Sequence, residues 1–168
     1  MTFEGRIRPA RPEDEPAIHA IHTAAFGQTT EADLVGRLEA DGDLVLSLVA
    51  CTDRPVGHIA FSRLDVSEAP SVRACALAPL AVDPSRQRQG IGSTLIKEGL
   101  DRLAEQGWDL VLVLGDPNYY GRFGFAAEAA AALRTPYDGP YLQALALSDK
   151  GPEAQGPVIY ARAFAELS

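Results

Sequence analysis

The sequence predicts a single α/β domain with a mixed, mostly antiparallel sheet of about six to seven strands flanked by helices. Its 168 residues are enough to bury a core without disulfides, and 46% of them are apolar, as in an ordinary globular domain. Helix-like and strand-like apolar runs follow one another along the chain. One of them, residues 108–116, is a continuous apolar stretch typical of a strand buried on both faces in a parallel or mixed sheet.

The chain begins with one predicted strand and two predicted helices. Residues 6–10 form the strand, and residues 11–26 carry apolar side chains at helical spacing. Residues 31–42 repeat that spacing and end at Gly42, a residue type that commonly ends helices. Both helices therefore precede the main part of the sheet.

The middle of the chain predicts an antiparallel hairpin and an interrupted third strand. Residues 44–51 and 55–66 are strand-like and are joined by a turn-prone segment. In the next strand-like run, residues 73–82, Pro79 has no N–H to donate to a neighbouring strand. We therefore expect a bulge or a locally parted strand at Pro79.

The last part of the chain predicts a long helix and further strands. The helix begins at about Gly90 and ends at Gly107, just before the continuous apolar strand. Two final strands are expected within residues 141–147 and 156–164. Residues 126–139 stay open, because their alanines favour a helix whereas their Pro and Gly favour a crossover loop.

The net charge of −8 argues against nucleic acid and anionic membranes as partners and favours cationic partners such as amines. The longest uncharged apolar run, Ala74–Val82, is too short to span a bilayer, and the N-terminal segment lacks the apolar core of a signal peptide. We therefore expect a cytoplasmic protein. Cys51 and Cys75 lie within apolar runs and have no metal-ligand spacing, which predicts buried, reduced thiols.

A glycine-punctuated turn within residues 80–95 is the strongest candidate site. It joins a strand to a helix at Gln87–Gly92, so unpaired backbone N–H groups and the positive end of the helix dipole meet there. Its two glycines let the backbone approach an anion closely, and Arg86 and Arg88 add positive charge. The sequence therefore predicts a phosphate site.

Two other phosphate motifs do not fit this turn. A Walker loop needs a lysine before its Ser or Thr, but Gly92 precedes Ser93. A dinucleotide-binding fold places its glycine motif early in the chain, whereas two helices and a hairpin come first here. A turn with only a structural role remains an alternative.

The residues around the turn resemble the GNAT superfamily of N-acetyltransferases. The resemblance to its motif A lies in Leu80-Ala81-Val82-Asp83-Pro84 followed by Gln87-x-x-Gly90-x-Gly92, and the resemblance to the end of its motif B lies in Tyr120-x-x-x-Gly124-Phe125. The order of predicted elements is also similar to the GNAT fold. The resemblance implies one GNAT acetyltransferase domain over residues 1–168, with a sheet that splays between its fourth and fifth strands.

The resemblance implies an acyl-CoA-dependent N-acetyltransferase. The acetyl group would pass directly from acetyl-CoA, the co-substrate, to a primary amine of a small molecule, peptide or protein in a ternary complex, without a metal ion. Tyr120 occupies the position of the family's general acid, which would protonate the departing thiolate. The neighbouring Tyr119 is expected to have a packing role.

The resemblance also implies where acetyl-CoA binds. The pyrophosphate would lie on the backbone amides of residues 87–92. The pantetheine arm would run between the fourth and fifth strands, against backbone groups of Leu80 and Val82. The implied cofactor-binding residues are Leu80, Ala81, Val82, Gln87, Arg88, Gln89, Gly90, Ile91, Gly92, Ser93 and Asn118.

No general base is evident in the sequence. The run Ala74–Val82 carries no Asp or Glu that could act from the fourth strand. Asp116, Glu31 and Glu68 are candidates by acidity alone, and each also fits an ordinary solvated carboxylate. Water relayed to a distant group, or an acceptor that arrives uncharged, would serve as well.

The histidines carry alternatives of their own. His19 and His22 lie three residues apart on a predicted helix, close enough to share a metal ion. Because no third ligand is visible, we expect both to lie on the helix surface. His58 either faces the substrate cleft or packs within the hairpin.

Hypotheses from other classes compete with the enzyme. A non-catalytic acyl-CoA-binding or sensing domain would keep the phosphate turn without turnover, and an interaction module would use the turn only as architecture. An enzyme that prefers a longer acyl chain is a further alternative. Superfamily members often pair through their C-terminal strands, so the resemblance leaves a homodimer open.

Overall fold

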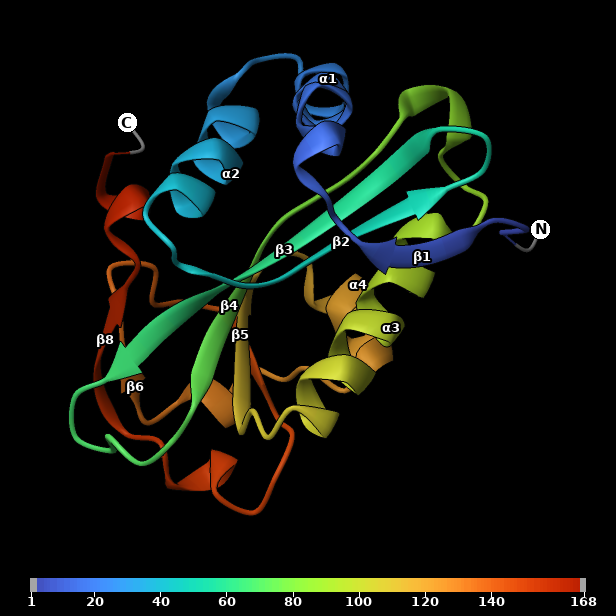
Figure 1. Cartoon of the computed structure of the whole chain (residues 1–168). Coiled ribbons are helices and arrows are strands. Elements are labelled where there is room, and N and C mark those ends of the chain that lie inside the picture. The colour runs from blue at the N-terminus through green and yellow to red at the C-terminus, as the bar shows by residue number, and fades with distance from the viewer. Residues whose placement is uncertain (1–2, 167–168) are drawn as a thin grey trace.

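The computed structural model describes residues 3–166 and contains eight strands and four α-helices within that range (Figure 1). The predicted N-terminal helices, hairpin, long helix and last two strands are all confirmed. The elements are β1 (Arg6–Pro9), α1 (Glu15–Phe26), α2 (Thr30–Ala40), β2 (Leu44–Cys51), β3 (Pro55–Val66), β4 (Ala74–Val82), α3 (Ile91–Glu105), β5 (Leu110–Leu114), α4 (Pro117–Tyr120), β6 (Leu133–Arg134), β7 (Leu142–Ala146) and β8 (Gly156–Tyr160).

The eight strands form one mixed sheet. Strands β1, β2, β3, β4, β5 and β7 lie side by side in that order, and neighbours are antiparallel except for the parallel pair β4–β5. β8 pairs antiparallel with the end of β3 and parallel with β6. The expected number of strands, about six to seven, was too low because β6 has only two residues and lies in the tract whose sequence shows no strand pattern.

The helices form two layers around the sheet (Figure 1). α1 and α2 cover one face, and α3 covers the other. Alternate residues of β2 show this division, because Leu48 and Ala50 pack under α3 whereas Val49 and Cys51 pack with Ile18 of α1. Within the described part of the chain, no helix is long and apolar enough to cross a membrane.

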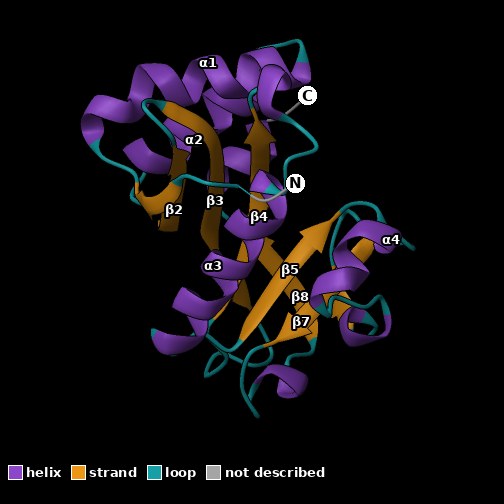
Figure 2. Ribbon diagram, turned by 90° about the vertical axis from the view of Figure 1, so that its right-hand side faces the viewer, coloured by secondary structure: helices purple, strands orange, loops and turns teal. Residues whose placement is uncertain are grey.

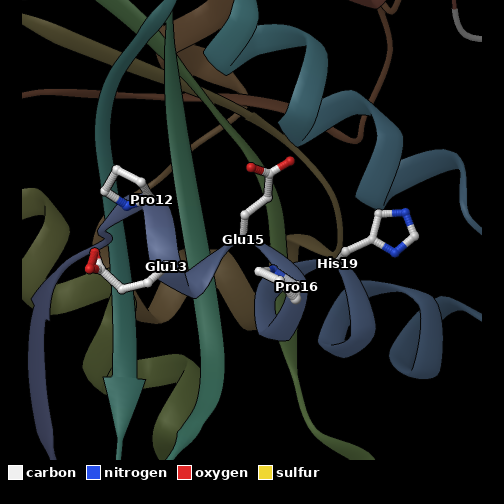
Figure 3. Close-up of a pocket in the computed structure, with 5 residues that line it drawn as sticks. All are labelled: Pro12, Glu13, Glu15, Pro16 and His19. Carbon is white, nitrogen blue, oxygen red and sulfur yellow. The ribbon is translucent and has the colours of Figure 1, made fainter.

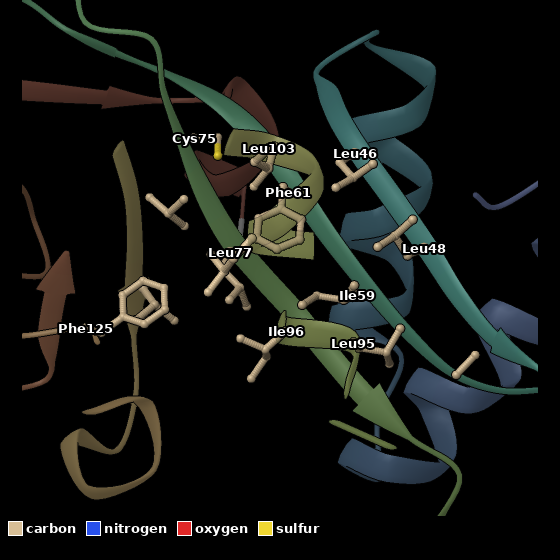
Figure 4. Packing of buried hydrophobic residues seen from close by; sticks show 14 of the residues in the cluster. Leu46, Leu48, Ile59, Phe61, Cys75, Leu77, Leu95, Ile96, Leu103 and Phe125 are labelled. Carbon is tan, nitrogen blue, oxygen red and sulfur yellow. The ribbon is translucent and has the colours of Figure 1, made fainter. Parts of the chain in front are cut away.

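The main core lies between α3 and the central strands (Figure 4). Phe61 of β3 is fully buried there, together with Leu95 of α3. Gly99 lets the helix approach the sheet, since a Cβ at that position would lie 2.6 Å from the Phe61 ring. Cys75 in this core and Cys51 are both buried and unpaired, as predicted. Burial raises the pKa of the Cys75 thiol, which keeps it protonated.

β4 and β5 pair over only part of the length of β4 (Figure 2). The parallel register joins residues 74–77 of β4 to residues 110–113 of β5. β4 then continues to Val82 while β5 ends at Leu114, so the two strands diverge and the expected splay is confirmed. On the β5 side, residues 78–82 have no strand partner within the described range.

A bulge on the other side of β4 accompanies the divergence. Ile59 of β3 pairs with Leu80, and Phe61 pairs with Leu77, so three steps along β4 match two steps along β3. The extra residue falls next to Pro79, which cannot donate a backbone hydrogen bond. The bulge expected from the sequence is therefore confirmed.

Candidate active site

The glycine turn leads from the free end of β4 into α3. Asp83 holds its start, because the carboxylate accepts hydrogen bonds from the Ser85 backbone N–H at 3.0 Å and from the Ser85 hydroxyl at 2.8 Å. Arg88 and Gly90 have φ angles of 66° and 81°, which turn the chain into the helix. Gly90 is the N-cap of α3 and supplies no side-chain cap, so the first N–H groups of the helix are available to a ligand.

A pocket of about 350 Å³, the anion pocket, opens at this turn. Arg86, Arg88 and Arg122 lie on its wall. Together with the positive end of α3, they make a cationic site in a protein whose net charge is −8. The lining residues are Val82, Arg86, Gln87, Arg88, Gly90, Ile91, Gly92, Ser93, Tyr119 and Arg122. The arrangement suits a phosphate group.

Seven of the predicted cofactor-binding residues line the anion pocket, and the other four do not. Leu80 lines a second pocket, described below. Ala81, Gln89 and Asn118 line neither of the two pockets. Ala81 is buried within the sheet, Gln89 accepts a hydrogen bond from a neighbouring arginine side chain at 3.3 Å, and Asn118 is exposed.

Tyr119 and Arg122 are binding candidates that the sequence pattern missed. The guanidinium carbon of Arg122 lies 5.4 Å from the centre of the Tyr119 ring, so the two side chains form one wall of the anion pocket. The Tyr119 hydroxyl reaches the glycine turn, 3.2 Å from where a Cβ on Gly92 would lie. Tyr119 also packs against the main core, as expected. Their spacing of three residues in a helical turn was the available signal.

A second pocket, the apolar pocket, lies where β4 and β5 diverge and has a volume of about 390 Å³. Because Leu80 lines this pocket and Val82 lines the anion pocket, the free end of β4 borders both. The residues that line the apolar pocket are Phe26, Glu31, Leu34, Ala76, Leu77, Ala78, Pro79, Leu80, Leu112, Val113, Leu114, Tyr120, Tyr137, Tyr160 and Phe164.

Tyr120 stands on the wall of the apolar pocket at the end of α4. Asp116 caps this short helix by accepting a hydrogen bond from the backbone N–H of Asn118 at 2.9 Å. A Cβ on Gly115 would lie 2.5 Å from Cε2 of Tyr120, so the glycine makes room for the ring. Burial, and to a lesser degree the nearby Tyr119, raises the pKa of Tyr120 to about 12. Its hydroxyl therefore keeps its proton at neutral pH.

The three candidate carboxylates occupy different places. Glu31, in the first turn of α2, lines the apolar pocket together with Tyr120. Asp116 serves as the cap of α4 and lines neither pocket. Glu68 forms an ion pair with Arg134 at 3.4 Å and also lines neither pocket. Of the three, the structure brings only Glu31 to the split between the strands.

A buried chain of polar side chains crosses from α1 to β2. His22 Nε2 lies 2.8 Å from His58 Nδ1, and His58 Nε2 lies 2.8 Å from the Ser47 hydroxyl oxygen. The expectation that both helix histidines lie on the surface was wrong for His22, which is fully buried, whereas His19 is exposed beside Asp33. His58 packs in the hairpin and lines neither pocket. Within residues 3–166, no three His, Cys, Asp or Glu side chains form a metal-binding group.

The buried imidazoles predict a loss of stability in mild acid. Burial lowers the pKa of His22 to about 4 and that of His58 to about 3, from an ordinary value of 6.5. The unfolded chain therefore binds protons first, and stability that is complete above pH 6.5 decreases as the pH falls toward 4. Each imidazole contributes a slope of roughly 1 kcal/mol per pH unit. Urea unfolding at several pH values between 7.5 and 5 measures this slope.

The control for this prediction is His19→Gln, which removes an exposed histidine from the same helix. We expect this variant to keep most of the pH dependence of the parent, because burial is the main cause of the lowered pKa of His22 and the charge of His19 is the smaller one. A free energy of unfolding that stays constant between pH 7 and pH 5 would contradict the assignment of a neutral, buried histidine pair. Carboxylates with lowered pKa values, such as that of Asp14, contribute only at lower pH.

A shallow acidic depression lies at the start of α1 (Figure 3). Its lining residues are Pro12, Glu13, Glu15, Pro16 and His19. They come from the 3₁₀ turn before α1 and from the first turns of that helix. None of them lines the anion pocket or the apolar pocket, so the depression is separate from the split between β4 and β5.

β4 and β5 part beside the N-terminus of α3, and the buried ring of Tyr120 lines the split. Residues 12–125 match the Acetyltransferase (GNAT) family. The chain belongs to this family, as the sequence resemblance predicted.

Similar proteins agree with this assignment. The uncharacterized N-acetyltransferase YhbS of Escherichia coli K12 is 42% identical over 135 residues, which cover 79% of this chain and 80% of that protein. A crystal structure of E. coli YhbS in complex with CoA matches with a TM-score of 0.91 and 37% identity, over 100% of this chain and 96% of that one. A crystal structure of a GNAT family acetyltransferase from Brucella melitensis in complex with acetyl-CoA matches with a TM-score of 0.81 and 38% identity, over 96% of this chain and 99% of that one.

Proposed function

We propose that the chain, residues 1–168, is one domain that transfers an acetyl group from acetyl-CoA directly to a primary amine in a ternary complex. The observation that carries the proposal is the split between β4 and β5, whose free strand end borders both the anion pocket and the apolar pocket. The complexes of two similar proteins with CoA and with acetyl-CoA support it.

The described residues fit coenzyme A in two places. The uncapped N-terminus of α3 and the three arginines of the anion pocket suit the pyrophosphate, because they combine oriented N–H donors with positive charge. On the β5 side, residues 78–82 have no strand partner, and their backbone groups suit the two amides of pantetheine, apart from the Val82 carbonyl, which accepts a hydrogen bond from the Gln87 side chain at 3.1 Å. We therefore propose that the residues lining the anion pocket hold the pyrophosphate of acetyl-CoA, and that its pantetheine arm lies along the free end of β4.

Tyr120 is proposed as the general acid. The amine nitrogen forms a bond to the acetyl carbon, the carbon–sulfur bond breaks, and the Tyr120 hydroxyl donates its proton to the departing sulfur. The proton that the amine loses passes to water or to a carboxylate, and the Tyr120 phenolate regains a proton from water. A positioned proton donor of this kind contributes roughly 10²–10⁴ in rate. The raised pKa of Tyr120, about 12, keeps the donor protonated over the whole physiological range.

Two measurements test this proposal. Calorimetric titration with acetyl-CoA and with CoA is expected to show saturable binding of each. Incubation with acetyl-CoA and a panel of primary amines, followed with a thiol reagent, is expected to show release of CoA that depends on the amine. Binding without release for any amine would favour the sensing domain. Absence of binding to either compound would leave the glycine turn with only a structural role.

A further inference from the structure

The charge pattern of the apolar pocket restricts what can enter it. Glu31 is the only charged residue among the described residues that line the pocket. No lysine or arginine of the described chain lines it, so nothing there balances a carboxylate or a phosphate on an acceptor. A charge that leaves water needs a partner of opposite sign. The pocket is therefore complementary to one positive charge.

An aromatic wall occupies much of the same pocket. The Tyr137 and Tyr160 rings pack edge to face with their centroids 5.4 Å apart, and the Tyr160 and Phe164 rings lie 5.6 Å apart. Burial raises the pKa of Tyr160 to about 12, so its hydroxyl stays uncharged. Phe26 of α1 and Leu34 of α2 complete the apolar surroundings. Such a wall favours an apolar or aromatic body, and its ring faces tolerate a nearby ammonium group.

We propose that the acceptor is a primary monoamine with an apolar or aromatic body, whose ammonium group is held by the carboxylate of Glu31 until it loses a proton to water and the neutral nitrogen attacks the acetyl carbon. This inference rests on the proposed acetyl transfer at the same pocket. The Gln28 side-chain amide donates to both carboxylate oxygens of Glu31, at 3.3 and 3.4 Å, and so restrains the carboxylate without neutralising it. An amino acid would bring its own carboxylate next to that of Glu31, and a polyamine would bring an ammonium group in addition to the one that Glu31 holds. No described residue that lines the pocket balances either extra charge.

A matched set of acceptors tests the substrate class. 2-Phenylethylamine has one ammonium on an aromatic body, L-phenylalanine adds a carboxylate to the same body, and putrescine replaces the ring by a second ammonium. With saturating acetyl-CoA, we expect kcat/KM for 2-phenylethylamine to exceed that of either other compound by at least roughly 10-fold.

A pair of variants tests the residue. Glu31→Gln keeps the shape of the side chain and removes its charge, so kcat/KM for 2-phenylethylamine is expected to fall by about 10- to 100-fold. The Kd for acetyl-CoA should not change, because Glu31 does not line the anion pocket. The Tm should fall only slightly, because an acidic side chain in the first turn of α2 stabilises that helix modestly. The control is Glu13→Gln, the same change at an exposed carboxylate in the acidic depression, and it should behave as the parent.

The outcomes separate this inference from the proposed function. Higher kcat/KM for putrescine or L-phenylalanine, or parental kcat/KM in Glu31→Gln, would overturn the acceptor assignment and leave acetyl transfer standing. Binding of acetyl-CoA with no CoA release for any amine would overturn acetyl transfer itself, and the acceptor assignment with it.

Discussion

Gly92→Glu is expected to abolish coenzyme A binding while the fold stays intact. Gly92 lies in the first turn of α3 and lines the anion pocket, so a carboxylate there would occupy the place proposed for the pyrophosphate. Placing like charges together costs several kcal/mol, which corresponds to a rise in Kd on the order of 10³-fold. Calorimetric titration with CoA measures this change directly.

Folding and binding can be separated in this experiment. An acidic side chain in the first turn of a helix is favourable, and this gain opposes the cost of moving the Tyr119 hydroxyl away from the new Cβ, so the Tm of Gly92→Glu should stay close to that of the parent. Gly36→Glu is the matched control, because Gly36 is exposed on α2 and open space surrounds the position of its Cβ. This control adds the same charge and should bind CoA normally. Parental affinity in Gly92→Glu would show that the pyrophosphate does not bind at the glycine turn.

Tyr120→Phe is expected to lower kcat by roughly 10²- to 10⁴-fold while leaving the Kd for acetyl-CoA unchanged. The substitution removes one hydroxyl and keeps the ring that packs edge to face against Tyr119 and Phe125. Since Tyr120 lines the apolar pocket and not the anion pocket, the loss should appear in turnover alone. The measurement is amine-dependent release of CoA at saturating acetyl-CoA.

The control for this variant is Tyr141→Phe. Tyr141 is 60% exposed and lines neither pocket, so loss of its hydroxyl should change neither kcat nor Kd. An unchanged kcat in Tyr120→Phe would remove Tyr120 from the role of general acid. A large rise in its Kd for acetyl-CoA would instead indicate a part in cofactor binding.

The elements around the phosphate turn were predictable because their signals are local. Gly90 and Gly92 at a strand-to-helix junction specify the turn, and Pro79 specifies the bulge, since a missing N–H cannot be compensated by distant residues. His22 could have been placed in the core from its own helix. It lies one turn after Ile18 and next to Ile21, both of them buried on that face.

The composition of the apolar pocket was not predictable, because it depends on tertiary structure. Glu31 comes from α2, Tyr120 from α4 and Tyr160 from β8, and only the folding of the sheet brings these three side chains to one cavity. From sequence alone, Glu31 could not be distinguished from Asp116 or Glu68. The strand β6 escaped prediction for a similar reason, since its two residues pair in parallel with β8 far along the chain.

The position of the unpaired β4 edge also affects how the protein avoids aggregation. Exposed strand edges attract strands of other molecules, and proteins usually cover or charge them. Here residues 78–82 leave their edge open inside the sheet rather than at its rim, with β5 and Tyr120 on the far side of the split. Leu114 of β5 and Tyr120 line the same pocket as residues 78–80 and so partly cover this open edge. A strand edge placed inside the sheet in this way is less accessible to a second copy of the chain than an edge at the rim.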